Sequence, residues 1–417
     1  MTRPRWFGAV ALCLTLTGCA SEDVGPACSG EPGTACLWAG GAAFPGFNPD
    51  AADRRESWLY FPTDLSFAAD GRAYILDWNN HAVRRVEADD TLHVVIGADY
   101  EGDGPPGETD RLPLGSPPGA PGTDVALNHP TDIDFMPDGT VVLAAWHNNK
   151  LRVLDPTTGV VKVLTGDGYG FSGDGGPAHA AVFNQPKAVV VDTDGTIYTI
   201  DQRNERIRKI AMDAQRTVTT VAGKGVAGSG GDGGQALDAE FGFDVKPTPE
   251  ASGALALRGR RLFVADFLNN RIRAIDLDTG IIDCVAGKSG KAGYSGDGGS
   301  AMAAEFNWPN DLEFGPDGRL YVADERNNAI RAIDLEADKV ETVAGNVTPC
   351  PGSREAVQTG GSDGQATLDV PGACALPVDG VPALEIQLNN PYGIAFDAPG
   401  NLYIADTFNN RIIQVKR

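Results

Sequence analysis

The sequence is short of basic residues, of histidine and of long apolar stretches. It has 34 Lys and Arg against 56 Asp and Glu, and the formal net charge is -22. General nucleic-acid binding needs clustered cations, so this balance argues against it. Only five His are present, no Cys-x-x-Cys pair occurs, and no convincing Ser, His and Asp set is found. The sequence therefore indicates neither a structural zinc site nor a serine nucleophile.

The first residues have the layout of an export signal. Arg3 and Arg5 precede the apolar run Phe7–Leu16, which is too short to span a bilayer as a mature helix. The run ends in Leu16-Thr17-Gly18-Cys19, which resembles the bacterial lipobox. That resemblance implies cleavage before Cys19 and a stable lipid anchor on its thiol and new amine. The alternative is an ordinary secreted protein with an incidental cysteine.

This reading divides the chain into three parts. We expect a signal peptide over residues 1–18, a lipidated flexible linker over 19–34 and a folded domain over 35–417. Ala20 follows the lipobox cysteine. In Gram-negative lipoproteins that residue implies the outer membrane. The chain is therefore expected to be exported and lipid-anchored at the outer membrane or cell surface.

Export implies an oxidising compartment, where cysteines form disulfides. Cys28 and Cys36 flank a Gly/Pro turn, and Cys350 and Cys374 share one Gly/Pro-rich insertion. We predict these two local pairings. Cys284 lies in an apolar strand and is expected to be a buried free thiol.

A single unit recurs along the chain. Its clearest copy is PNDLEFGPDGRLYVADERNNAIRAID at Pro309–Asp334, and a second runs over Pro391–Val415. Further copies start at Pro62, Pro130 and Pro186, and a degenerate one spans Leu255–Asp276. Each copy holds short Val-, Ile- and Tyr-rich strands joined by Asp-Gly or similar turns. A fourth strand ending in Val-Ala-Gly or a variant follows five of the copies. Four antiparallel strands repeated six times predict an all-β fold, a six-bladed propeller.

The sixth copy lacks a fourth strand at the C-terminal end of the sequence. Cys36-Leu37-Trp38-Ala39-Gly40 matches the Val-Ala-Gly ending instead. We therefore predict that the N-terminal strand completes the last blade. This arrangement closes the ring and leaves no long strand edge exposed.

The repeats resemble NHL repeats over about residues 36–417. The pieces that carry the resemblance are LYIADTFNNRIIQV, LYVADERNNAIRAI and FSGDGGPA. The resemblance implies the propeller fold but no particular activity, because propellers serve as enzymes, receptors and scaffolds. The first-strand Gly of the family is kept at Gly393 but is Asp at Asp64, Asp132 and Asp311. The Asp that ends the second strand is lost at Ala145.

Asp64, Asp132 and Asp311 are candidate metal ligands. They occupy one repeat-equivalent position on the innermost strands, which line the channel of a propeller. Converging carboxylates suit Ca²⁺ or Mg²⁺, and Ca²⁺ is the ion we would expect. Otherwise each carboxylate caps its own turn or sits in water.

The Gly-Asp-Gly-Gly loops look like ion sites at first. They lack the spaced acids and terminal Glu of an EF-hand, so a structural turn is sufficient. These loops, the Asn-Asn loops and the insertions at 102–127 and 346–389 should share one face of the propeller, which we favour as the functional face. Its candidate binding residues are Trp78, Trp146, His147, Phe267, Arg326 and Phe408. Aromatics there favour a protein or carbohydrate ligand, although packing against the neighbouring insertion would explain them equally.

These observations favour a non-enzymatic binding scaffold of the envelope, held to the membrane by its lipid and without nucleic-acid partners. The alternative is a divalent-metal-dependent hydrolase or lactonase, by analogy with gluconolactonase-like propellers. In that case an ion at the three aspartates would activate water.

Overall fold

The computed structural model describes residues 30–41, 45–48, 50–97, 102, 119–166, 168–243, 250–288, 290–347 and 380–417. The predicted signal peptide, Cys19, Cys28, Cys350, Cys374 and most of both insertions lie outside these ranges. Within them, no helix has both the length and the apolar character needed to cross a membrane.

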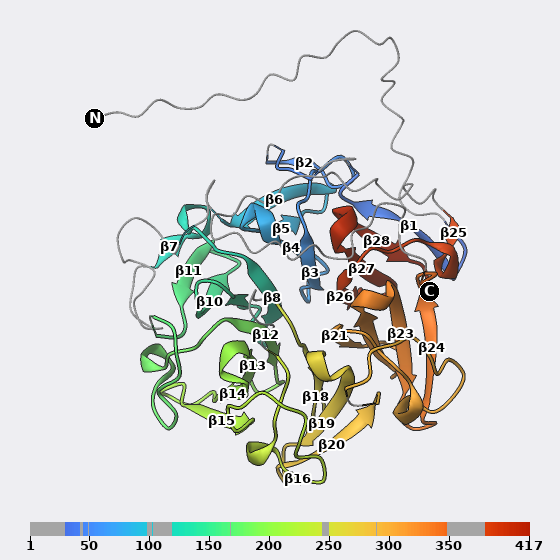
Figure 1. Ribbon diagram of the computed structural model, residues 1–417. Coiled ribbons are helices and arrows are strands. Elements are labelled where there is room, and N and C mark those ends of the chain that lie inside the picture. The colour runs from blue at the N-terminus through green and yellow to red at the C-terminus, as the bar shows by residue number, and fades with distance from the viewer. Residues whose placement is uncertain are drawn as a thin grey trace, which may run out of the picture.

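Six antiparallel sheets form a ring (Figure 1), which confirms the predicted six-bladed propeller. The innermost strands are β3 (Pro62–Phe67), β8 (Pro130–Phe135), β12 (Pro186–Val191), β17 (Leu255–Arg258), β21 (Pro309–Phe314) and β26 (Pro391–Phe396). Blades 1 to 6 are numbered here in this order. The second strands are β4 (Ala73–Asp77), β9 (Val141–Ala145), β13 (Ile197–Asp201), β18 (Arg261–Asp266), β22 (Leu320–Asp324) and β27 (Leu402–Asp406).

The outer strands complete each blade. The third strands are β5 (Ala82–Val86), β10 (Lys150–Asp155), β14 (Arg206–Ile210), β19 (Arg271–Asp276), β23 (Ala329–Asp334) and β28 (Arg411–Val415). The fourth strands are β6 (Thr91–Ile96), β11 (Val160–Val163), β15 (Val218–Ala222), β20 (Ile281–Ala286), β24 (Lys339–Ala344) and β1 (Thr34–Ala39). Four blades also carry a two-residue outer strand, so the blades have four or five strands rather than a uniform four: β2 (Ala52–Asp53), β7 (Ala120–Pro121), β16 (Gly234–Gln235) and β25 (Val381–Pro382).

The N-terminal strand closes the ring as predicted. β1 pairs antiparallel with β28, with Ala35 opposite Val415 and Leu37 opposite Ile413. The two strands lie side by side in Figure 1, one from each end of the colour scale. Blade 6 therefore contains strands from both ends of the folded domain.

The core lies between neighbouring blades. Ile404 and Ile413 of blade 6 share one buried cluster with Ala323 and Ala332 of blade 5. Because a blade packs against a neighbour on each side, its middle strands are apolar on both faces, as in sheets covered on both sides. This explains why their sequences read as continuous rather than alternating apolar runs.

In five of the six blades, the Asp-to-Arg spacing of the repeat builds a buried network at the turn. In blade 5, Asp324 accepts hydrogen bonds from the Asn327 side chain at 2.8 Å and from the Asn307 amide at 2.7 Å. Arg331 of the next strand lies 3.2 Å from the same carboxylate. Blade 2 has Ala145 in place of this aspartate, and there Asn148 accepts the equivalent amide of Asn128 at 2.9 Å.

In four of the six blades a second asparagine of the turn joins the blade to the next, and His81 and Glu205 make the contact in the other two. Asn328 has a positive φ of 51°, a conformation that Asn tolerates better than most residues. Its side-chain oxygen accepts the amide N–H of Asn390 in the following blade at 2.8 Å. The same contact joins Asn149 to Gln185 and Asn270 to Trp308. We call this contact the blade latch.

Candidate functional site

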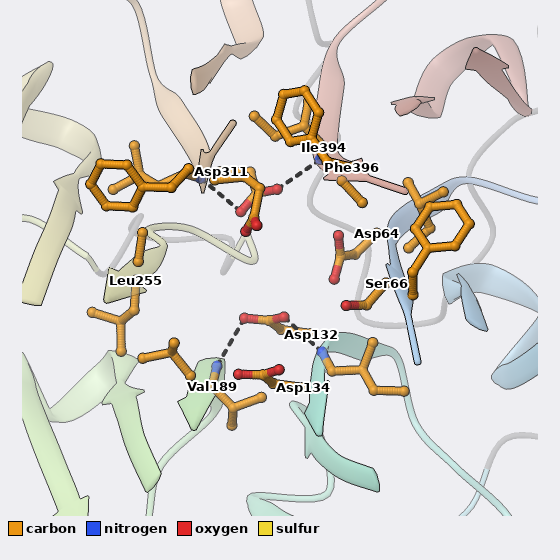
Figure 2. A pocket seen from close by; sticks show the side chains of 18 of the residues that line it. Asp64, Ser66, Asp132, Asp134, Val189, Leu255, Asp311, Ile394 and Phe396 are labelled. Atoms are coloured by element: carbon orange, nitrogen blue, oxygen red, sulfur yellow. Dashed lines mark hydrogen bonds between the residues drawn. The ribbon is translucent and has the colours of Figure 1, made fainter. Parts of the chain in front are cut away.

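The six inner strands surround a cavity of about 270 Å³ on the ring axis. Alternate residues of a strand point to the same side, so the inner strands supply stacked layers of side chains. The acidic positions fall in two of these layers. The first layer holds Asp64, Asp132 and Asp311, and the second holds Ser66, Asp134 and Glu313. Figure 2 shows the carboxylates of Asp64, Asp132, Asp134 and Asp311 pointing into one space from three blades.

Main-chain amides fix most of these carboxylates in place. Asp132 accepts the N–H of its neighbour Ile133 at 2.6 Å and that of Val189, in blade 3, at 2.8 Å. Asp311 accepts Leu312 at 2.8 Å and Ile394, in blade 6, at 2.7 Å. Each carboxylate therefore ties its own strand to the next blade, as dashed lines in Figure 2 show. Part of their role is structural.

Asp134 makes the same kind of tie one layer further along the strand. It accepts the N–H of Phe135 at 2.7 Å and that of Val191, in blade 3, at 2.6 Å. Burial raises its pKa to about 6. This carboxyl is thus fixed in position like those of the first layer, with its proton affinity increased.

Asp64 is held differently. Its side chain is only 8% exposed, and in the described part of the chain its hydrogen-bond donor is the amide of the adjacent Leu65. A Cβ atom at Gly393 would lie 2.6 Å from the Asp64 Oδ1 atom. It would also lie 2.5 Å from the Thr63 carbonyl oxygen and 2.6 Å from the Asp64 Cα atom, so Gly at this position lets the main chains of blades 6 and 1 approach closely. Burial, then the charges of Asp132 and Asp311, raise the Asp64 pKa well above its usual value.

Glu313 is the most open carboxylate of the cavity. Its side chain is exposed to solvent from the channel, although protein surrounds it. This enclosure, followed by the charge of Asp311 and those of Asp134 and Asp132, raises its pKa well above the ordinary value. No hydrogen bond from the described residues reaches its carboxylate.

Lys187 is the cation that acts on the first layer. It is 7% exposed, and its Nζ atom donates to the Asn310 carbonyl at 3.0 Å, from blade 3 to blade 5. Its charge partly offsets the rise in the pKa of Asp132, which burial brings to about 7. Five carboxylates lining the cavity thus face one nearby ammonium, and the cavity keeps an excess of acid.

The three predicted metal ligands share the cavity without forming a metal-ligand set. Among the residues that the structure describes, no three or more His, Cys, Asp or Glu side chains are grouped so as to hold a metal ion. Both oxygens of Asp132 and of Asp311 already accept amides. Ca²⁺ at these residues stays a prediction.

The Gly-Asp-Gly-Gly loops have a structural use. Asp297 pairs with the buried Arg331 at 2.6 Å, Asp174 pairs with Arg208 at 2.8 Å, and Asp232 pairs with Arg271 at 2.7 Å. These carboxylates therefore cover the arginines of the third strands. The geometry supports the structural turn over the ion-binding loop.

Two of the proposed contact aromatics lie in the interior. Trp146 is 1% exposed and donates from Nε1 to Gln202 at 2.7 Å. Phe267 is fully buried, with its ring 4.9 Å from that of Trp308. Exposure of these two rings was therefore the wrong expectation. Among the described residues, each of these two rings packs against the following blade, Trp146 at Gln202 and Phe267 at Trp308.

The other proposed contact residues are half-buried. The Trp78 ring lies 4.1 Å from that of His129, and the Arg326 guanidinium lies 4.0 Å above Trp308. Phe408 packs on Phe61 at 5.0 Å. Whether these side chains bind a partner stays a prediction.

His147 stacks on the Trp146 ring at 3.9 Å. Its Nδ1 atom lies 2.9 Å from that of His129. Burial lowers the pKa of His147 to about 4 and that of His129 to about 2. Both imidazoles are therefore neutral at physiological pH.

Sequence reasoning missed Asp134, Glu313 and Lys187. Strand alternation could have found the first two, because Asp134 and Glu313 stand two residues after Asp132 and Asp311 and so share their face. Lys187 gave no such signal, because its contact with Asn310 crosses the ring.

No protein-family model matches the chain. It is 27% identical over 275 residues to Protein SUPPRESSOR OF QUENCHING 1, chloroplastic, of Arabidopsis thaliana, covering 63% of this chain and 24% of that protein. It is 28% identical over 257 residues to NHL repeat-containing protein 2 of Homo sapiens, covering 56% and 31%. The match thus spans about a quarter to a third of these relatives' lengths.

A solved structure shows the same architecture. An auxiliary nutrient binding protein of Bacteroides thetaiotaomicron superposes with a TM-score of 0.58 at 14% identity, covering 91% of this chain and 75% of that one. At this identity the likeness concerns the fold alone. The chain is an all-β, six-bladed propeller. The relatives and the repeat together support a propeller of the NHL type.

Proposed function

We propose that this propeller is a binding scaffold whose axial cavity takes a cationic ligand. The observation that carries the proposal is the charge imbalance of the cavity, where five carboxylates face one nearby ammonium. Like charges this close oppose one another's ionisation, and a bound cation would relieve that repulsion. Glu313 is open to solvent, so a ligand can reach the layers from the channel.

A second candidate is the divalent-metal-dependent hydrolase. The observation that favours it is that Asp64, Asp132 and Asp311 all line the same cavity, at equivalent positions of three blades. An ion bound there would supply Lewis-acid activation of a water molecule. The amide bonds to Asp132 and Asp311 favour the scaffold over this candidate.

The face of the Asn-Asn turns is a further candidate surface. We propose it for a protein or carbohydrate partner, on the half-buried side chains of Trp78, Arg326 and Phe408. Flat aromatic rings give large contacts at little entropic cost. A triple alanine variant should lose partner capture while keeping the circular-dichroism spectrum of the folded protein.

We also propose that the chain is anchored to the bacterial envelope through Cys19. The lipobox-like Leu16-Thr17-Gly18-Cys19 supports this placement. Metabolic labelling with a radioactive fatty acid tests it. Label should enter the wild-type chain and not a Cys19→Ser variant, and label in both would overturn the proposal.

Metal content and cation-dependent melting distinguish the two functions of the cavity. The purified protein is compared with the variant Asp64→Asn, Asp132→Asn, Asp311→Asn. A stoichiometric ion that the variant loses would favour the metal enzyme and justify screening lactones. A melting shift with organic cations but not with Ca²⁺ would favour the scaffold, and no response to any cation would overturn both.

A further inference from the structure

We infer that the ligand of the axial cavity is a linear diamine or polyamine, with two ammonium groups joined by an aliphatic chain. The inference rests on the proposed cation-binding function and specifies its ligand. It goes beyond an inorganic ion because the acids stand in two separate layers along the axis and most of them are fixed in place.

The two acidic layers of the cavity are separated along the strands. Asp132 and Asp134 stand two residues apart on β8, and Asp311 and Glu313 stand two apart on β21. A strand rises about 3.3 Å per residue, so the layers are about 6.6 Å apart along the strand. A single small ion cannot touch both layers. An extended ligand with a cation at each end can.

The fixed carboxylates also favour nitrogen donors over a metal. Ca²⁺ needs six to eight oxygen atoms within about 2.6 Å, which requires carboxylates to converge. Asp132, Asp134 and Asp311 each accept amides on both oxygens and are tied to a neighbouring blade. They keep free lone pairs toward the cavity without being able to swing together. Hydrogen bonds from ammonium groups need only this arrangement.

Asp64 is an independent sign of a missing partner. It is more than nine-tenths buried, it points into the cavity in Figure 2, and in the described residues only the adjacent Leu65 amide bonds it. Buried carboxylates are normally paired or fully hydrogen-bonded. An incoming ammonium would supply the missing donors.

Lys187 indicates where the second ammonium would go. This buried alkyl-ammonium lowers the pKa of Asp64, Asp132 and Asp311, all in the first layer. Neither Asp134 nor Glu313 has a cationic neighbour among the groups acting on it. The second layer is therefore the uncompensated end, and Glu313 is its accessible member.

Isothermal titration of the purified protein with 1,4-diaminobutane, 1-aminobutane and CaCl₂ tests the inference. The diamine should bind one per chain, and the monoamine about tenfold or more weaker, because it pairs with one layer only. Glu313→Gln should weaken diamine binding by about tenfold or more, since it removes one charge pair. Because Glu313 has no hydrogen-bond partner among the described residues, this change should leave the fold intact. Glu336→Gln, at an exposed position, is the matched control.

The possible results distinguish failure of the diamine as the ligand from failure of cation binding itself. Diamine binding that Glu313→Gln weakens and Glu336→Gln does not would support both. Binding of CaCl₂ without the diamine would overturn the diamine while keeping a cation site. Equal affinity for the two amines, or diamine binding unchanged in Glu313→Gln, would also overturn the inference. No binding of any cation would overturn the proposed function itself.

Discussion

The side-chain oxygen of Asn410 accepts the main-chain N–H of Phe61 at 2.9 Å, across 349 residues of sequence. This contact is the blade latch between the last blade and the first. Asn410 has a positive φ of 55°, so its turn carries the amide oxygen toward the neighbouring blade. The asparagine of the repeat is therefore a joint between blades as well as a turn residue.

Asn410→Ala should lower the free energy of unfolding by about 1–3 kcal/mol, because it leaves the Phe61 amide without its acceptor. Urea unfolding measures the loss. Asn410→Gly, which accepts a positive φ without strain, separates the lost bond from backbone strain. If the Gly variant were as stable as the wild type, the latch would carry no energy.

Asp64→Asn should make the protein more stable at pH 8 and change little at pH 4. Burial and the neighbouring acids raise the pKa of Asp64 in the folded state, so the folded chain binds its proton more tightly than the unfolded chain. The stability that this proton binding contributes is fully present below the pKa of Asp64 in the unfolded chain, about 4. It is lost as pH rises through the raised pKa of Asp64 in the folded chain.

Melting temperatures between pH 4 and pH 8 measure this effect. Asp138→Asn, at an exposed turn, is the control and should show no such trend. If Asp64→Asn gained stability at pH 4 rather than at pH 8, the pKa of Asp64 would not be raised in the folded protein.

Asp406→Ala should destabilise the protein by about 3–5 kcal/mol, because Arg411 would keep a buried charge without its partner. The two groups lie 2.7 Å apart, and both are almost completely buried. The double variant Asp406→Ala, Arg411→Met should lose less, since the unpaired charge is gone. Chemical denaturation of the wild type, of the single variants Asp406→Ala and Arg411→Met and of the double variant tests this. A double variant destabilised by the sum of the two single losses would contradict the prediction.

Asp297→Asn should lower stability by about 1 kcal/mol in the same way with Ca²⁺ and with a chelator, because its partner is Arg331 rather than an ion. Thermal melts in the two buffers check this. Calcium-dependent stabilisation of the wild type that vanished in the variant would restore the ion-binding interpretation of this loop.

Repetition made the fold predictable from the sequence, because each blade restates the same strands and turns. Even the closure by residues 34–39 followed from counting fourth strands. The hydrogen-bond partners of individual side chains were harder to predict from the sequence. That Asp132 bonds Val189 depends on how one blade is rotated against the next. No repeat-by-repeat alignment contains that rotation.

The burial of Trp146 shows the same limit. Its repeat position indicated a loop, and loops are usually exposed. Six such turns converge around one axis, and the convergence buries a residue that a single blade would leave open. Strand alternation could have predicted the second acidic layer. It could not have predicted the contact of Lys187 with Asn310, which crosses the ring.

The pairing of β1 with β28 sets the order in which the molecule can assemble. Ala35 finds Val415 only after every intervening blade has been synthesised. Contacts of such sequence separation slow folding, because the entropy of closing the loop is lost before the contact forms. As the chain leaves the ribosome, Thr34–Ala39 must wait as an unpaired apolar strand, open to aggregation. A chaperone that holds this first strand until Arg411–Val415 emerges would therefore act on the step that decides whether the ring forms.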